Sequence, residues 1–329
     1  MPDMLIKPMG IGQLIDRSFQ LYRKYFAKLM LLMLILLGPI YLFQSFLLSD
    51  AQSVGSESVL EQIQQGVSVE EILITVGESS NTMDIWKILL LVLVVMPILL
   101  IIIGPIAVAT VVYMVKAFLS GEPIPSVSEL LRSAFRRLGP LAGSTFLVAL
   151  IMFGIYMVTV IVIILLVLVV ALLAGVVQGF EGSSPGVGMI ILMVLGGILL
   201  FFSCMLGISY FFIRFMYYLP FVALAEESIA IGRSWRITRK SFWRLFLMYL
   251  VIAIVLYIIV TVTSLVFAFF TVGIVSQLLQ SIVSIVLMPL WFIPYVLSFF
   301  DLRARNEGMG LDELIQNTIQ EDGAITTHE

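Results

Sequence analysis

The sequence predicts an all-α, polytopic integral membrane protein with six transmembrane helices. Three observations predict this class: the composition is strongly apolar, the apolar residues form long uninterrupted runs, and the basic residues gather on one side of those runs. Hydrophobic residues make up 61% of the 329 residues and charged residues only 12%, whereas soluble domains carry about 25% charged residues. A soluble fold could not cover so apolar a surface, so we expect much of the chain to face lipid.

Six apolar runs reach or exceed the about 20 residues that a helix needs to cross the hydrocarbon core. They are residues 29–48, 85–118, 141–177, 189–218, 245–270 and 281–300. The second, third and fourth runs are longer than a minimal span, so we expect these helices to tilt or to continue beyond the hydrocarbon. Gly-Pro and Pro residues interrupt several runs, which predicts kinks for packing or, alternatively, broken helices along a transport path.

The basic residues predict the orientation of these spans. All of the 18 lysines and arginines except Lys87 lie before the first run, between the end of the second run and the start of the third, around the fourth–fifth connection or after the sixth. The opposite connections are acidic, in particular residues 49–84. The positive-inside rule therefore predicts that both termini are cytoplasmic and that 49–84 is an extracytoplasmic loop.

One charged phrase occurs twice. Residues 15–29 read IDRSFQLYRKYFAKL and residues 231–245 read IGRSWRITRKSFWRL, with seven of fifteen positions identical. A weaker third copy begins at Leu130. Such internal repetition predicts three related units, about 11–119, 127–222 and 228–300, each an amphipathic helix followed by a transmembrane hairpin. These units form one membrane domain, 1–300, and a cytoplasmic tail follows at 301–329.

The phrase has the pattern of a helix that lies in the membrane interface. Ile15, Phe19, Tyr22, Phe26 and Leu29 are spaced to share one helical face, and basic residues fall nearly opposite. Such a helix can serve only as an anchor that fixes the orientation of the spans. Alternatively, it can bind anionic headgroups or a partner protein. The candidate headgroup or partner contacts are Arg17, Arg23, Lys24, Lys28, Arg132, Arg136, Arg137, Arg233, Arg239, Lys240 and Arg244.

Arg214 lies among aromatic residues near the cytoplasmic end of the fourth run. An arginine inside a span would be a functional candidate. We expect instead that Arg214 extends its side chain to the interface, as Lys116 does at the end of the second run.

Three stretches, all expected to be cytoplasmic, resemble a known family. Residues 7–26 (KPMGIGQLIDRSFQLYRKYF), 231–246 (IGRSWRITRKSFWRLF) and 299–314 (FFDLRARNEGMGLDEL) are similar to the glycerophosphoryl diester phosphodiesterase membrane-domain family. The resemblance implies a bacterial plasma-membrane protein. In the family's namesakes a soluble phosphodiesterase barrel follows the membrane region. Such a barrel needs about 250 residues, and nothing here resembles its catalytic histidines or metal ligands, so the resemblance implies architecture rather than hydrolysis.

The composition argues against several chemistries. The one histidine, His328, and the one cysteine, Cys204, leave no catalytic, cofactor or metal constellation, and no carboxylate lies in the middle of an apolar run. The basic stretches adjoin lipid-seeking aromatic residues, which argues against nucleic acid. We therefore expect a non-enzymatic scaffold or regulatory subunit that engages anionic lipid, a partner protein or both. The alternative is a transporter or channel component for a lipid or small solute.

Overall fold

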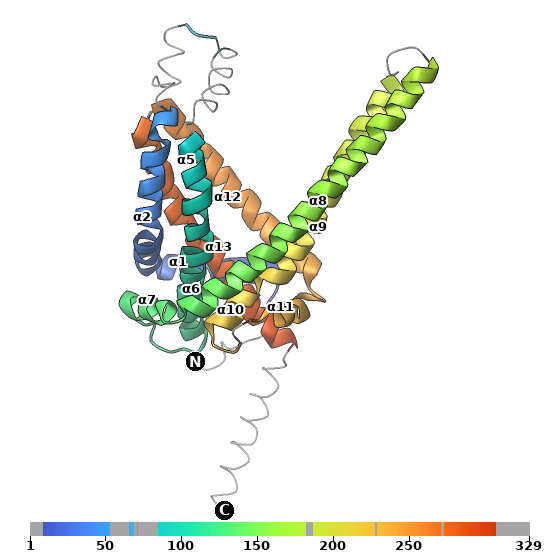
Figure 1. Cartoon of the computed structure of the whole chain (residues 1–329). Coiled ribbons are helices and arrows are strands. Elements are labelled where there is room, and N and C mark those ends of the chain that lie inside the picture. Colours follow the sequence, from blue (N-terminus) through green and yellow to red (C-terminus); the bar gives the residue numbers. More distant parts are fainter. Residues whose placement is uncertain are drawn as a thin grey trace, which may run out of the picture.

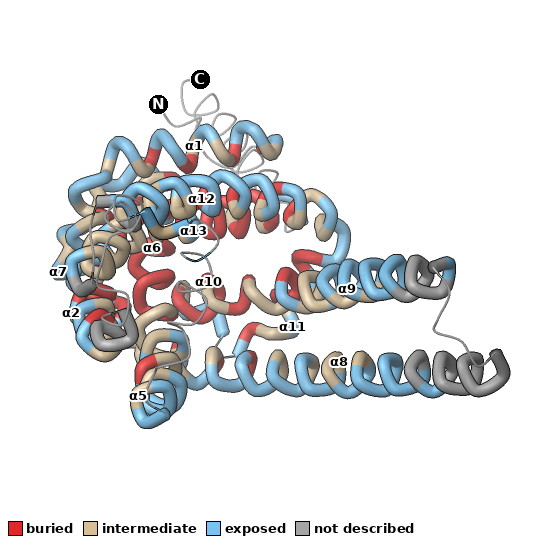
Figure 2. The backbone as a smooth tube through the Cα atoms, turned by 90° about the horizontal axis from the view of Figure 1, so that it is seen from above, coloured by how far each residue is buried: buried red, intermediate tan, exposed pale blue. Residues whose placement is uncertain are grey.

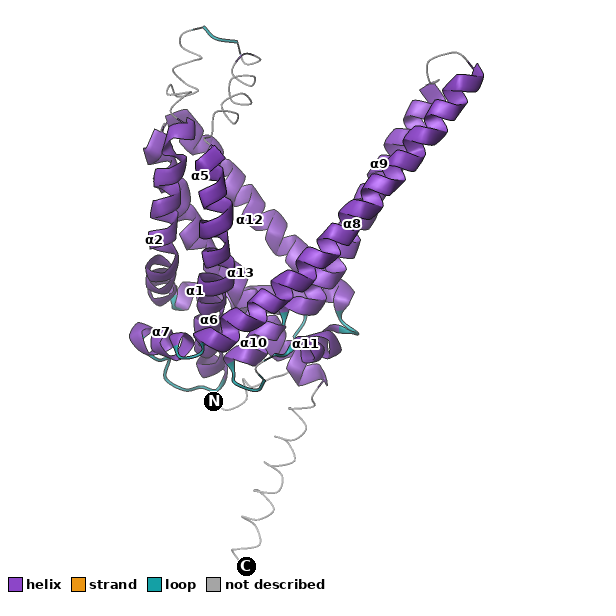
Figure 3. Ribbon diagram, viewed as in Figure 1, coloured by secondary structure: helices purple, strands orange, loops and turns teal. Residues whose placement is uncertain are grey.

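The computed structural model describes residues 9–52, 66–68, 71, 85–181, 187–227, 229–270 and 273–306. Within these ranges every regular element is a helix (Figure 3). Most of the predicted 49–84 loop and the tail beyond residue 306 lie outside the described residues.

The described helices include six that are long and apolar enough to cross a membrane. Five are single α-helices: α2 (Phe26–Gln52), α8 (Leu138–Glu181), α9 (Val187–Met216), α12 (Phe242–Phe270) and α13 (Gly273–Asn306). The sixth is a continuous path through α5 (Ile85–Leu90), η3 (Leu91–Val95), η4 (Ile98–Ile103) and α6 (Gly104–Leu119). The prediction of six long apolar helices is confirmed, and it indicates a multi-pass membrane protein. Helix α13 continues to Asn306, so the first six residues of the predicted tail, 301–306, are helical.

Four short helices gather at one end of the long ones: α1 (Ile11–Lys24), α7 (Val127–Phe135), α10 (Tyr218–Ala223) and α11 (Ile231–Thr238) (Figure 1). The two described ends of the chain meet there as well, because the backbone N–H of Met9 donates a 2.6 Å hydrogen bond to Oδ1 of Asp301. An even number of crossings places both chain ends on one side, as the six runs require. We call this end of the molecule the basic end.

The core lies between α2, α6 and α13, and the α8–α9 hairpin extends away from it (Figures 1 and 2). Leu32 of α2, Val111 of α6 and Val296 of α13 are fully buried. Along the hairpin, by contrast, large apolar side chains such as Phe153 and Leu199 are exposed. Helices that are apolar all round are typical of membrane spans, so exposed apolar side chains here are expected to face lipid.

Proline acts differently in different spans. Pro39 lies inside α2, and Pro289 and Pro294 lie inside α13, without ending either helix. In the second span, two π-helical segments flank Pro97, and the second of them ends at Ile103, just before Gly104. The π-helical hydrogen-bond pattern is rare and occurs frequently at functional sites.

The repeated phrase does not form one continuous helix, as its spacing predicted. Helix α1 ends at Lys24, Tyr25 adopts a non-helical conformation (φ −117°, ψ 25°), and α2 begins at Phe26. Phe26 and Leu29 therefore belong to the apolar span and not to the amphipathic helix. The second copy breaks at the corresponding place, between Thr238 and Phe242.

Both copies bury the same register positions. Leu14, Ser18 and Leu21 are buried in the first copy, and Ala230, Ser234 and Ile237, each 216 residues later, are buried in the second. The two serines can be buried because their hydroxyls donate hydrogen bonds to backbone carbonyls. Ser18 donates to Leu14 (2.7 Å) and Ser234 donates to Arg214 (2.6 Å). In the weaker copy only Ala134 of the corresponding Arg-Ser-Ala segment is buried.

Helix α7 starts with a capping box. Ser126 Oγ accepts from the Glu129 N–H (3.4 Å), and the Glu129 carboxylate accepts from the Ser126 N–H (2.8 Å). These hydrogen bonds to Ser126 lower the pKa of Glu129. The chain therefore enters α7 at a defined angle, and its basic residues are placed beside α6.

Helices α6 and α10 end in turns of the same kind. The residue with positive φ is a glycine in one turn and an alanine in the other. Gly121 has φ +67° and Ala225 has φ +68°. In each turn the following glutamate N–H bonds back to a helical carbonyl: Glu122 to Ala117 (3.0 Å) and Glu226 to Phe221 (3.2 Å). A left-handed conformation suits glycine and costs an alanine about 1 kcal/mol or more.

We therefore expect Ala225→Gly to stabilise the protein by about 0.5–1 kcal/mol, since relief of the strain exceeds the added chain entropy. Unfolding in mixed micelles with increasing SDS measures this change. Gly121→Ala is the matched control, because no atom lies within 4 Å of the added Cβ and only backbone strain is introduced. It should destabilise by about 1 kcal/mol; equal stability of both variants would contradict the interpretation.

Candidate functional site

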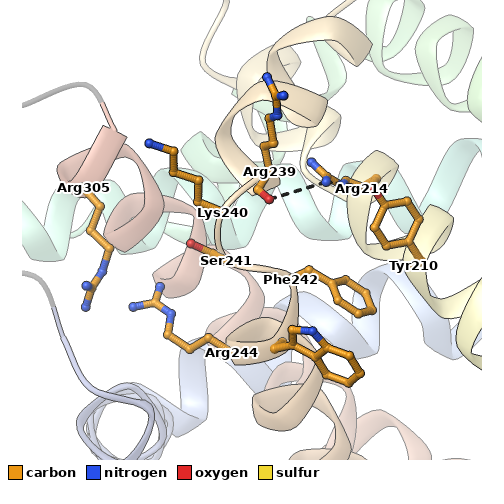
Figure 4. A pocket seen from close by; sticks show the side chains of 9 residues that line it. Tyr210, Arg214, Arg239, Lys240, Ser241, Phe242, Arg244 and Arg305 are labelled. Atoms are coloured by element: carbon orange, nitrogen blue, oxygen red, sulfur yellow. Dashed lines mark hydrogen bonds between the residues drawn. The ribbon is translucent and has the colours of Figure 1, made fainter.

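A pocket of about 570 Å³ opens at the basic end, where α11 turns into α12. This volume is within the range of ligand pockets, about 300–1,000 Å³. Nine residues line it: Tyr210, Arg214, Arg239, Lys240, Ser241, Phe242, Trp243, Arg244 and Arg305 (Figure 4). They come from α9, the α11–α12 turn, the first turn of α12 and the end of α13. We call this the turn pocket.

Arg214 is the buried member of the lining, with 5% of its surface exposed. Its guanidinium donates to the backbone carbonyl of Trp235 (3.0 Å) and to the hydroxyl of Tyr210 (2.9 Å), and it lies 4.9 Å from the centres of both rings. Its Nε atom has no hydrogen-bond partner. A buried cationic donor without a partner is costly. Because Nε is fully buried, Arg214 contributes its positive charge to the pocket, and Nε makes no direct contact there.

This position corrects the expectation that Arg214 extends to the interface. The sequence places Arg214 near a helix end, where a long side chain reaches headgroups easily. In the structure Trp235 of α11 covers it, and Ser234 Oγ bonds to its backbone carbonyl. Arg214 is thus enclosed by protein, because α11 packs across the end of α9.

Asp301 holds the opposite wall of the turn pocket. Its side chain is fully buried and accepts from Arg244, from Nε of Arg305 (3.1 Å) and from the Met9 N–H (2.6 Å). Arg305 and Arg244 also donate to the Met9 carbonyl, at 2.8 and 3.5 Å. One carboxylate therefore positions two arginines of the pocket and ties the N-terminal segment to α13.

The charges around the turn pocket do not balance. Five cationic side chains line it, and within the described part of the chain Asp301 is the one carboxylate that pairs with any of them. Arg214, Arg239 and Lys240 have no ion-pair partner among these residues. The pocket therefore has an excess of four positive charges, which favours an anionic ligand.

The first turn of α12 adds backbone donors to this positive field. The turn pocket is lined by Ser241 and by the first three residues of α12, Phe242, Trp243 and Arg244. The first N–H groups of a helix have no intrahelical acceptor, and the helix dipole makes this end positive. In Figure 4 the Ser241 hydroxyl points toward the space bounded by Lys240, Arg244 and Arg305. Helix starts of this kind bind phosphate and carboxylate groups.

The predicted contacts of the first copy of the phrase are spread around α1 and the start of α2. Arg23 and Lys24 are exposed, and Arg17 is half-buried. Lys28 donates to the carbonyls of Ile124 and Pro125, both at 3.1 Å. Lys28 thus ties α2 to the segment before α7 instead of facing outward.

The predicted contacts of the middle copy divide in the same way. Arg132 and Arg136 are exposed, while Arg137 donates to the carbonyl of Val222 (3.4 Å). In the second copy, Arg233 pairs with Glu226 (2.9 Å). Arg239, Lys240 and Arg244 are therefore the predicted residues that the structure brings together in one pocket.

Sequence reasoning missed Asp301 and Arg305 as parts of this site. Both lie in the 299–314 stretch, and a carboxylate four residues before an arginine on a helix is a recognisable ion-pair pattern. What the pattern could not show is that the chain's other end, at Met9, completes the cluster. Among the described residues no group of three or more metal-ligating side chains occurs.

The basic end and the six long apolar helices define a multi-pass membrane protein with an anion-attracting pocket at one end. We found no match to the chain among protein-family models, curated proteins or solved structures.

Proposed function

We propose that the protein is a non-enzymatic, multi-pass protein of the bacterial plasma membrane, a scaffold or regulatory subunit that engages anionic lipid, a partner protein or both at its basic end. Both termini are cytoplasmic in this proposal. The observation that supports it is that α1, α7 and α11, with their exposed basic residues, gather at the same end of the six apolar helices (Figure 1). Basic residues at the inner surface attract anionic headgroups with about 1 kcal/mol each.

The three-unit architecture is part of this proposal. In each unit a short basic helix is followed by a break and then by a long apolar helix: α1 and α2, α7 and α8, α11 and α12. The matching buried registers of the first and third units support a common origin. The proposal also includes the similarity of residues 7–26, 231–246 and 299–314 to the glycerophosphoryl diester phosphodiesterase membrane-domain family, of which this chain would be a member without a catalytic barrel.

Native mass spectrometry of the protein released from mixed bilayers tests the proposal. From bilayers of equal phosphatidylglycerol and phosphatidylcholine, the protein should retain mainly phosphatidylglycerol, and salt should reduce this preference because exposed charges are screened. Glutamine at Arg23, Lys24, Arg132 and Arg136, four exposed positions outside the turn pocket, should lower the preference further. Lys87→Gln at the opposite end is the control. Equal retention of both lipids by the wild type would refute the engagement of anionic lipid in this proposal.

A lipid or solute transporter is the second candidate, and the π-helical segments around Pro97 favour it. Transporters use interrupted spans whose free backbone groups line a path. The two candidates differ in proteoliposomes: a lipid transporter accelerates movement of a fluorescent lipid between leaflets, whereas a scaffold leaves the rate at that of protein-free vesicles.

A further inference from the structure

We infer that the turn pocket binds the terminal phosphate of a phosphomonoester lipid, a phosphatidic-acid type of headgroup. The inference rests on the proposed function and narrows it to one ligand class at one site. Three features of the pocket support it: its charge excess, its donors and its position between polar and apolar surfaces.

The charge excess favours a monoester over a diester. A phosphodiester carries one negative charge, whereas a phosphomonoester carries about 1.5 to 2 at neutral pH. Arg239 and Lys240 are exposed and have no ion-pair partner in the described chain, and Asp301 already offsets part of the charge of Arg244 and Arg305. A dianionic group offsets the remaining excess of four charges more fully than a monoanion does.

The donors suit three free phosphate oxygens. A terminal phosphate presents three acceptor oxygens, and the turn pocket offers three kinds of donor from different elements. These are the first-turn N–H groups of α12, the Ser241 hydroxyl beside them, and the cationic groups of Arg239 and Lys240. The Ser241 hydroxyl has no hydrogen bond to the described residues, although serine at the start of a helix ordinarily caps it.

The surroundings indicate a lipid and not a soluble phosphate. Tyr210, Phe242 and Trp243 line the same pocket, and Trp243 is 64% exposed. From this end α9 and α12 diverge (Figure 1), and both carry exposed apolar residues, among them Phe202 on α9 and Ile254 on α12. A phosphate in the pocket would therefore have apolar surface for its acyl chains directly beside it, with tryptophan at the boundary where it is favoured.

The full-length protein is titrated with phosphatidic acid, phosphatidylglycerol and phosphatidylcholine, and binding is followed by native mass spectrometry. The wild type should bind phosphatidic acid about tenfold more tightly than phosphatidylglycerol. Arg239→Gln with Lys240→Gln should remove this preference, because each charge near the headgroup contributes substantially to binding. Both side chains are exposed, so the variant should fold normally.

The matched control removes the same charge elsewhere at the basic end. Arg236 and Lys116 are exposed and do not line the turn pocket, so Arg236→Gln with Lys116→Gln should keep the preference for phosphatidic acid. Equal loss in the two variants would overturn the inference. Inorganic phosphate and glycerol 3-phosphate are added as soluble competitors of phosphatidic acid. If either displaces phosphatidic acid when present at the same concentration, the inference that the ligand is a lipid would be overturned.

The two proposals fail in different ways. A wild-type protein that prefers both anionic lipids to phosphatidylcholine, without discriminating between them, would overturn the monoester inference and leave the proposed function standing. A protein that binds all three lipids equally would refute both the monoester inference and the engagement of anionic lipid in the proposed function.

Discussion

Replacing Asp301 with alanine should lower the free energy of unfolding by about 3 kcal/mol. The carboxylate is 1% exposed and accepts from two arginines and from the backbone of Met9. Breaking a buried ion pair from one side costs about 3–5 kcal/mol because the remaining charges stay desolvated. The side chains of Arg244 and Arg305 are 22% and 35% exposed, so we expect the lower end of that range. Unfolding in mixed micelles with increasing SDS measures it.

Asp301→Ala should also release the N-terminal segment. The N–H of Met9 loses its acceptor, and the two arginines that hold the Met9 carbonyl lose theirs. Limited proteolysis should then cut before α1 faster than in the wild type. Asp16→Ala is the control, since Asp16 is an exposed carboxylate on α1. If Asp301→Ala unfolds at the same SDS fraction as the wild type and resists proteolysis equally, the cluster around Asp301 contributes little to stability.

Phe221→Ala should destabilise the protein by about 4 kcal/mol, within the range of about 3–5 for removal of a buried phenylalanine. Phe221 is fully buried, and its ring packs edge-to-face against Phe299 at 4.8 Å. The Arg233 guanidinium lies 4.4 Å from the ring centre, and loss of this cation–π contact adds to the destabilisation.

The comparison for Phe221 is Phe212→Ala on α9. Phe212 is 55% exposed, on a surface that we expect lipid to cover, and its truncation should change stability by less than about 0.5 kcal/mol. The same SDS titration serves both variants. A loss of similar size at the two positions would mean that α10 is not part of the packed core.

The six apolar helices and the basic end were predictable because both depend on the bilayer. Length and apolarity decide which segments can cross hydrocarbon, and the positions of lysine and arginine decide which ends lie together. Neither property requires knowledge of which helix contacts which. The repeated phrase could be found for the same reason, since it is a property of the chain alone.

The break inside that phrase was not predictable from spacing. Tyr25 and Ser241 occupy corresponding positions, and each lies in the break just before the long helix although neither break contains Gly or Pro. The apolar pattern continues across Phe26 and Leu29, so periodicity alone predicts one helix. The structure has two helices, and the first packs Leu14, Ser18 and Leu21 against the core.

What the sequence by itself determined is therefore the class of the protein, the number of its long helices and the end at which its positive charge lies. Only the tertiary structure decided which charges matter. It paired Arg244 and Arg305 with Asp301, enclosed Arg214 beneath Trp235, and left Arg239 and Lys240 open at the start of α12. The physical reason is that a charge acquires its role from the groups within a few ångströms of it, and those groups come from α9, α11, α12 and α13 and from the segment at Met9.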